Sequence, residues 1–79
     1  MIEVTVYSRT GCHLCHVVVD QLEEIRKEKQ FNLEVLLIDG DAELERKYGE
    51  QIPVTLINGQ PHDYWRIDPV RFKAALDQL

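Results

Sequence analysis

The residues best suited to chemistry are Cys12 and Cys15, the only two cysteines of the chain, which are separated by two residues. They lie at the junction between a strand-like stretch and a helix-like stretch, and a Cys-x-x-Cys pair in a strand-helix-strand pattern is typical of a redox-active dithiol. The start of a helix offers unpaired N–H donors and a partial positive charge, and both favour the reactive thiolate. We therefore predict Cys12 as the exposed attacking thiol and Cys15, one turn further along and on the buried side, as the resolving thiol.

Three other interpretations of these residues stay open. Cys-x-x-Cys-His, completed here by His16, is also the attachment signal for c-type haem, which needs export and normally a second axial ligand. Zinc needs about four ligands, and Cys12, Cys15 and His16 with His13 or His62 are all that the sequence offers, so we predict no metal site within one chain, whereas a site shared across a dimer stays open. The thiols could instead serve a non-enzymatic module that senses redox state or holds a partner.

Composition and charge narrow the class of protein. A length of 79 residues predicts a single domain, 1–79, and a hydrophobic share of 44% is ordinary for a folded globule. Fourteen acidic against nine basic residues give a formal charge of −5, which argues against nucleic acid or an anionic membrane surface as partner. Strand-like residues begin at Ile2 without a basic start and an apolar stretch, so we expect a cytoplasmic protein. In a reducing cytoplasm a close cysteine pair is more often catalytic or metal-binding than structural.

The first half of the chain predicts a strand, a helix and a second strand. Apolar and polar residues alternate over residues 2–8, and Gly11 allows a tight turn before the cysteines. A helix is predicted from residue 12 or 13 to Lys29. Its apolar stripe consists of Leu14, Cys15, Val18, Val19, Leu22 and Ile25. The apolar run over residues 31–38 predicts a strand covered on both faces, and this order of elements favours a right-handed parallel βαβ unit.

The second half predicts a short helix, a hairpin and a final helix. Asp41 is the N-cap of a helix from residue 41 or 42 to Tyr48, which Gly49 ends. A strand over 54–57 is followed by Asn58-Gly59, a strong hairpin signal, so an antiparallel strand is expected near 61–65.

The final helix begins with Asp68 as N-cap and Pro69 at the first helical position. Its predicted apolar face consists of Val70, Phe72, Ala75, Leu76 and Leu79. The complete order is β-α-β-α-β-β-α, an α/β arrangement in which a parallel half precedes an antiparallel half.

Several stretches of the chain resemble glutaredoxins, within the thioredoxin-fold superfamily. They are Val6-Tyr7-Ser8-Arg9-Thr10-Gly11-Cys12-His13-Leu14-Cys15, Gln51-Ile52-Pro53 and Asn58-Gly59. Tyr7–Cys15 and the segment Tyr48-Gly49-Glu50-Gln51-Ile52-Pro53-Val54 are closer still to a small glutaredoxin-like family of unassigned function. The resemblance covers essentially the whole chain. It implies a thioredoxin-like fold, with a four-stranded mixed sheet flanked by three helices, and thiol–disulfide oxidoreductase activity.

The resemblance also implies roles for single residues. Cys12 matches the nucleophile and Cys15 the resolving thiol, whereas Pro53 matches a cis-proline that faces the dithiol. Ile52 matches the residue whose backbone pairs with an extended substrate, and Arg9 stands where glutaredoxins often carry a lysine that could hold the thiolate or a substrate carboxylate. The implied partner is a disulfide-containing protein or a glutathione mixed disulfide, with glutathione as co-substrate and no bound cofactor.

Two stretches depart from the glutaredoxin pattern. His13-Leu14 separates the cysteines, where glutaredoxins usually carry Pro-Tyr, and a protonated His13 would lower the pKa of Cys12. Glutaredoxins also carry a Gly-Gly turn, followed by an acidic residue, that lets glutathione lie against bare backbone. The aligned residues here are Trp65-Arg66-Ile67-Asp68. We predict Trp65 as a strand-end aromatic packed on the core, with a place near the dithiol as the alternative, and Asp68 as a helix cap.

Overall fold

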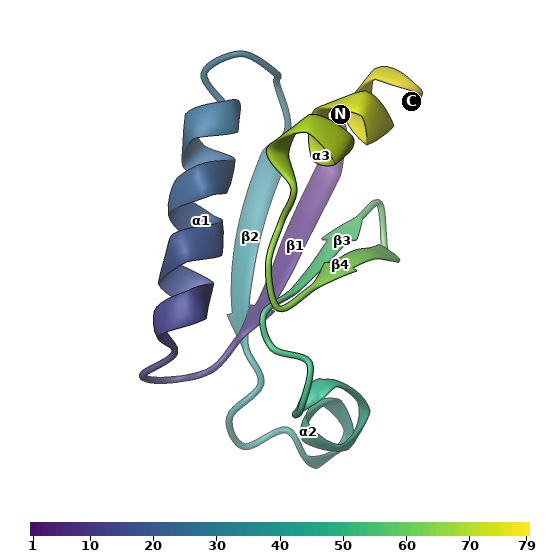
Figure 1. Ribbon diagram of the computed structural model, residues 1–79. Coiled ribbons are helices and arrows are strands. Elements are labelled where there is room, and N and C mark those ends of the chain that lie inside the picture. Colours follow the sequence, from purple (N-terminus) through teal and green to yellow (C-terminus); the bar gives the residue numbers. More distant parts are fainter.

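A computed structural model describes all residues, 1–79, and its elements follow the predicted order. They are β1 (Glu3–Ser8), α1 (His13–Ile25), β2 (Asn32–Leu37), α2 (Ala42–Tyr48), β3 (Val54–Ile57), β4 (Gln60–Tyr64) and α3 (Pro69–Asp77). The strands form one sheet in the order β2-β1-β3-β4, in which β1 and β2 are parallel and the other neighbours are antiparallel. In Figure 1, α1 and α3 lie alongside the sheet, and α2 lies beyond the end at which β1 stops. No helix combines the length and the apolar character that crossing a membrane requires.

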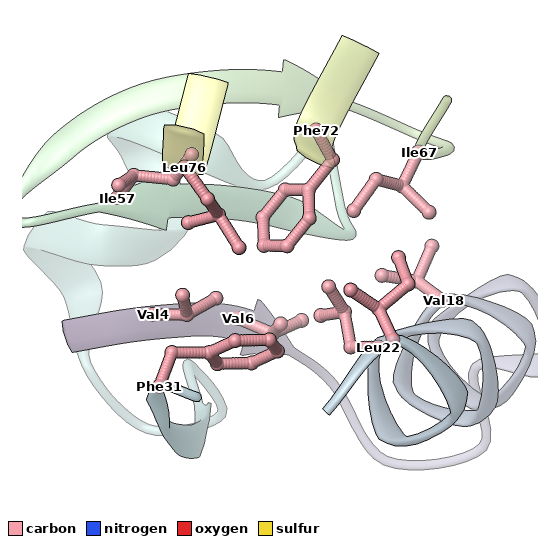
Figure 2. Packing of buried hydrophobic residues seen from close by; sticks show 10 residues of the cluster. Val4, Val6, Val18, Leu22, Phe31, Ile57, Ile67, Phe72 and Leu76 are labelled. Atoms are coloured by element: carbon pink, nitrogen blue, oxygen red, sulfur yellow. The ribbon is translucent and has the colours of Figure 1, made fainter. Parts of the chain in front are cut away.

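The larger core cluster joins α1 and α3 to one face of the sheet (Figure 2). Successive side chains of a strand point to opposite faces, so Val4 and Val6 of β1 point to the same face, and both are fully buried. Phe72 of α3 meets Phe31 edge to face, with 5.6 Å between the ring centroids. The cluster consists of Val4, Val6, Val18, Leu22, Ile25, Phe31, Ile57, Ile67, Phe72 and Leu76. This packing fixes α1 against the sheet and thereby fixes where its N-terminus lies.

A smaller cluster connects α2 and the loop after it to the cysteines. Tyr7, which follows Val6 on β1, stacks on Tyr48 at the end of α2 with 5.0 Å between the ring centroids. The buried members of this cluster are Cys15, Ile38, Tyr48, Ile52, Val54 and Leu56. Segments that are far apart in the sequence therefore meet around the second cysteine.

The predicted helix starts and the predicted hairpin are confirmed. Asp41 and Asp68 are the N-caps of α2 and α3, and each side chain accepts hydrogen bonds from two backbone N–H groups of its helix. Pro69 is the first residue of α3. Asn58 and Gly59 join β3 to β4 with φ angles of 50° and 83°, the left-handed values that a two-residue hairpin turn requires.

The prediction that the second strand is covered on both faces is wrong. β2 pairs only with β1 and forms an edge of the sheet. Val35, Leu36 and Leu37 are 43%, 38% and 58% exposed. A continuous apolar run does not reveal whether other elements will cover both faces of the strand, and here Val35 and Leu37 border a hollow beside α1 while Leu36, on the opposite face, is also exposed.

Some predicted helix residues are also corrected. α1 ends at Ile25 rather than at Lys29, because the N–H groups of residues 27 and 28 bond to carbonyls three residues back and tighten the chain into turns. Leu14, Val70 and Leu79 lie on predicted apolar faces but are exposed. Leu14 and Val70 lie in the first turn of a helix, and Leu79 follows the end of the last one. The apolar periodicity continues at these positions, although no neighbouring element covers the side chains.

Candidate redox-active site

The backbone between β1 and α1 presents Cys12 at the start of the helix. Gly11 has a φ of 74°, which turns the chain after β1, and Cys12 is the extended N-cap residue of α1. Its Sγ accepts a hydrogen bond from the N–H of Cys15 at 3.2 Å. The first turn of α1 contains no acidic residue. This helix-terminal N–H donor and the absence of an acidic residue from the first turn both favour a thiolate at this sulfur.

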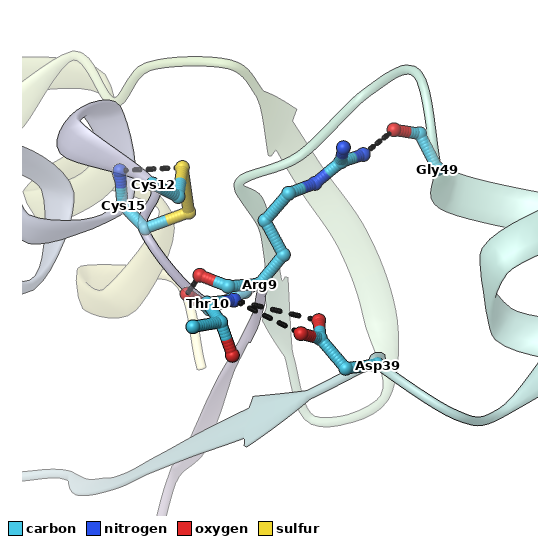
Figure 3. The surroundings of a disulfide bond; sticks show 7 residues. Arg9, Thr10, Cys12, Cys15, Asp39 and Gly49 are labelled. Atoms are coloured by element: carbon cyan, nitrogen blue, oxygen red, sulfur yellow. Dashed lines mark hydrogen bonds between the residues drawn. A yellow bond between two sulfur atoms is a disulfide. The ribbon is translucent and has the colours of Figure 1, made fainter.

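Cys12 and Cys15 form a disulfide bond in this structure, with their Cα atoms 5.3 Å apart (Figure 3). Cys15 is 3% exposed and belongs to the smaller core cluster. Cys12 is only partly buried and packs against the edge of the same cluster. One cysteine is therefore accessible to a partner and the other lies beneath it, and their roles as nucleophile and resolving thiol stay predictions.

The loop before Cys12 is held by two contacts to distant segments (Figure 3). The N–H of Thr10 donates to both carboxylate oxygens of Asp39 at 3.4 Å, and the guanidinium of Arg9 donates to the carbonyl of Gly49. The Arg9 side chain thus extends toward the end of α2 and away from the two sulfurs, and its predicted contact with a substrate stays a prediction. Sequence reasoning missed Asp39. The signal was present in the parallel pairing of β1 with β2, which brings the residues after both strands to one edge of the sheet.

Ile52 and Pro53 lie in the loop between α2 and β3, which packs against Cys15. The peptide bond between them is cis, as the resemblance implies, and Pro53 is fully buried. Ile52 is 7% exposed and shares the smaller core cluster with Cys15. Neither the N–H nor the carbonyl of Ile52 takes part in a hydrogen bond. An unpaired backbone segment of this kind can accept one more extended strand.

Trp65 contacts the same loop through hydrogen bonds that sequence reasoning did not predict. Its N–H donates to the carbonyls of Pro53 at 2.8 Å and Gln51 at 3.3 Å, and its indole Nε1–H donates to the carbonyl of Glu50 at 2.9 Å. The side chain is 55% exposed, so the prediction that it packs on the core is wrong. The sequence signal for this role was the bulky Trp65-Arg66-Ile67 in place of a glycine turn. An aromatic residue at the end of a strand is, however, equally typical of a side chain that packs on the core.

The histidines lie in two separate places. His13 and His16 are exposed in the first turn of α1. His62 lies on β4 with its ring 5.7 Å from that of Phe72, where burial and the Arg71 guanidinium lower its pKa, and Asp63 opposes them. No three His, Cys, Asp or Glu side chains come together in a way that could hold a metal ion.

A hollow of about 360 Å³ lies between α1 and the edge strand β2. It borders the buried Cys15 and the loop that precedes Cys12. Its lining residues are Ser8, Arg9, Thr10, Gly11, Cys15, His16, Val19, Val35 and Leu37. Val35 and Leu37 of β2 therefore border the same hollow as the buried Cys15.

Comparison with solved structures defines the class of fold. Chloroplastic thioredoxin z superposes with a TM-score of 0.75 at 15% sequence identity, over 99% of this chain and 77% of its own. A thioredoxin from Halobacterium salinarum has a TM-score of 0.66, also at 15% identity, over 98% of this chain and 73% of its own. Together with the element order and the mixed sheet, these likenesses confirm the predicted thioredoxin fold.

The family follows from closer matches. The model of the glutaredoxin-like domain family (DUF836) matches residues 3–77, and the chain belongs to this family. Protein Ne2328 from Nitrosomonas europaea has a TM-score of 0.86 at 32% identity, over 95% of this chain and 91% of its own. Protein XcR50 from X. campestris has a TM-score of 0.80 at 34% identity, over 96% of this chain and 97% of its own. An uncharacterized protein of Mycobacterium tuberculosis is 32% identical over 94% of this chain and 81% of its own length.

Proposed function

We propose that the protein is a dithiol–disulfide oxidoreductase that reduces disulfide bonds through Cys12 and Cys15. The observation that carries this proposal is the arrangement at the start of α1. The partly exposed Cys12 sulfur accepts the helix N–H of Cys15 and is bonded to the sulfur of that buried residue. Family membership and the thioredoxin fold support the same chemistry.

In the first step, the reduced protein attacks a substrate disulfide with the Cys12 thiolate. A bond forms between Cys12 Sγ and one substrate sulfur, the substrate's own S–S bond breaks, and the other substrate sulfur leaves as a thiolate that takes a proton from water. The hydrogen bond from the Cys15 N–H stabilises the Cys12 thiolate before the attack. The unpaired N–H and carbonyl of Ile52 would pair with the substrate backbone and hold its cysteine beside Cys12.

In the second step, Cys15 loses its proton and its thiolate attacks Cys12 Sγ. The mixed disulfide breaks, the second substrate sulfur leaves as a thiolate, and the protein is left with the Cys12–Cys15 disulfide. The substrate gains two electrons and the protein loses two. An external thiol, either glutathione or a dithiol reductase, then restores the reduced protein. We expect this cycle to run toward reduction in a reducing compartment such as the cytoplasm.

His13 and Arg9 have secondary roles in the proposal. A protonated His13 in the first turn of α1 would add positive charge near Cys12 and favour its thiolate. Arg9, whose guanidinium bonds to the carbonyl of Gly49, would hold the loop before the cysteine.

A trapping experiment tests the proposal. The Cys15→Ser variant lacks the resolving thiol, so its reduced Cys12 should accumulate mixed disulfides with substrates in a cell extract free of added thiols, and mass spectrometry should identify them. Cys12→Ser is the matched control, because it keeps one thiol but removes the accessible one, and it should trap far less. A wild-type protein whose reduced form cleaves no disulfide would contradict the proposal. A stable adduct with a single protein, together with slow turnover of other disulfides, would instead support a redox-sensing or partner-binding module.

A further inference from the structure

We propose that Trp65 determines the substrate class of the dithiol. Its indole contacts the polypeptide that flanks the target cysteine, and it thereby favours disulfides in polypeptides over glutathione mixed disulfides. This inference rests on the proposed function and adds to it a substrate class and a specificity-determining residue.

The first observation is that Trp65 has an unfavourable backbone conformation and an exposed side chain. Its φ is 65°, in the left-handed region that glycine and asparagine adopt easily and that is a genuine outlier for a bulky residue. The ring is 55% exposed, so packing within the chain recovers little in return. A residue that is costly for the backbone and poorly buried points to a contact that the isolated chain does not make.

The second observation is that the ring is held in place. The backbone N–H of Trp65 bonds to the carbonyls of Pro53 and Gln51, and the indole Nε1–H bonds to the carbonyl of Glu50. Hydrogen bonds at both the backbone and the tip of the side chain orient the indole before any substrate arrives. Such preorganisation lowers the entropic cost of binding.

The third observation is where Trp65 lies relative to the backbone N–H and carbonyl of Ile52, which have no hydrogen-bond partner. The carbonyls of Gln51 and Pro53, on either side of Ile52 in the chain, bond to Trp65, whereas the N–H and carbonyl of Ile52 itself are unpaired. A substrate strand that pairs with Ile52 would therefore run along a short segment that Trp65 borders, within reach of a side chain next to the substrate cysteine.

The chemistry of the exposed indole favours a polypeptide over glutathione. Its one polar group already has a partner, so the exposed surface offers only aromatic contact, which apolar, aromatic and cationic side chains can use. Glutathione has no such side chain next to its cysteine and carries a net negative charge, and this protein carries a formal charge of −5. A polypeptide supplies both a backbone for Ile52 and a side chain for Trp65.

The first arm of the test compares three substrates of the full-length protein. They are a peptide mixed disulfide with phenylalanine on both sides of its cysteine, the same peptide with glycine at those positions, and a glutathione mixed disulfide. Trp65→Gly should lower kcat/KM about tenfold for the phenylalanine peptide, the usual size of losing one aromatic contact, and change the glutathione substrate less than twofold. Trp65→Phe should keep most of the preference. Leu79→Ala, which removes another exposed apolar side chain, should change nothing.

The second arm does not depend on catalysis. Trp65 is the only tryptophan, so its fluorescence reports its surroundings directly. A chemically activated phenylalanine peptide is coupled to Cys12 of the Cys15→Ser variant, and the tryptophan emission should shift relative to the same variant coupled to glutathione. Because glycine adopts a left-handed φ without strain, Trp65→Gly should fold, and thermal melting checks this.

The outcomes separate the two proposals. A wild-type protein that cleaves none of the three substrates would overturn the proposed function. Equal losses for all three substrates in Trp65→Gly, or an unchanged emission spectrum in the phenylalanine adduct, would overturn the role of Trp65 even if the dithiol is active. A selective loss for the phenylalanine peptide together with a shifted emission would support both.

Discussion

The two ends of the sheet differ in how many of their polar groups take part in hydrogen bonds and ion pairs. At the end where β1 begins, the N–H of Glu3 bonds to the Asn58 side chain at 2.9 Å, and Asn32 donates to the Glu3 carboxylate. Ion pairs at the same end join the region after α1 to α3, Lys29 to Asp77 at 2.7 Å and Lys73 to Glu28 at 2.6 Å. At the end where β1 stops, the backbone of Ile52 is unpaired, Trp65 is exposed and Cys12 is only partly covered.

This difference shows how a chain of 79 residues can hold an accessible dithiol and still fold. The larger core cluster and the paired end supply the packing that keeps α1 on the sheet, whereas the cysteines lie at the tip of that helix. Substitutions at the two ends should therefore affect different properties. Those at the dithiol end should affect chemistry, and those in the core and at the paired end should affect stability.

The largest expected effect is at the dithiol end. Cys12→Ser removes the nucleophile, so disulfide reduction should fall by at least about a thousandfold, as is usual when a covalent nucleophile is lost. The melting temperature, measured on reduced protein for both variant and wild type, should change little because Cys12 is only partly buried. A variant that retains substantial activity would show that Cys12 is not the attacking thiol.

The largest effect on stability should come from Phe72, which is fully buried between α3 and the sheet. Phe72→Ala should lower the free energy of unfolding by about 3–5 kcal/mol, because it removes buried surface and leaves a cavity. Denaturant titration measures this loss. Exposed Val70→Ala on the same helix is the control and should have almost no effect. Similar losses for both variants would contradict the packing described for α3.

A pH-dependent loss of stability is expected from His62. Its Nε2 is buried without a hydrogen-bond partner, and burial lowers its pKa, so the folded protein binds the proton less readily than the unfolded chain. The stability that neutral His62 supports is present above its ordinary pKa of 6.5 and is lost as the pH falls from there through the folded-state value.

Melting temperatures measured from about pH 7.5 to 5.5, a range above most carboxylate titrations, should reveal this dependence. His62→Phe should flatten the profile, because phenylalanine can pack on Phe72 and does not titrate. An identical slope in the variant would show that other groups cause it.

The smallest effect is expected from the ion pair between Glu28 and Lys73. The hydrogen bond and the charge of Lys73 lower the pKa of Glu28, so the pair contributes above the ordinary carboxyl pKa of 4.5 and its contribution is lost as the pH falls through the lowered value. Because the pair is exposed to solvent, Glu28→Gln should lower the melting temperature only slightly at low salt, and the difference should vanish at high salt. A large, salt-independent decrease would mean that Glu28 has a different role.

The order of the elements was predictable because each boundary has a local cause. Asp41 and Asp68 have the side chains that cap helices, and Asn58-Gly59 has the backbone freedom that a tight hairpin needs. The cysteines were also predictable, because their spacing and their place at a helix start are visible in the sequence. Each of these features depends on residues within a few positions of one another.

The features that were not predicted depend on contacts between distant segments. Whether Val35 and Leu37 are buried depends on which elements pack around β2, and the periodicity of their own segment contains no information about that. Trp65 was wrongly assigned to the core from its position at the end of a strand, because its hydrogen-bond partners Glu50, Gln51 and Pro53 come beside it only in the folded chain. Asp39 was missed for the same reason, although the pairing of β1 with β2 could have indicated its place beside Thr10.

The exposed edge strand has a consequence for how the protein behaves at high concentration. β2 reads Asn32-Leu33-Glu34-Val35-Leu36-Leu37, and Glu34 is its only charged residue. An uncapped apolar edge is a template on which further copies of the same strand can add, and a single charge on such an edge is enough to oppose it. Glu34 is therefore the one carboxylate on this strand that opposes the edge-to-edge addition of further copies.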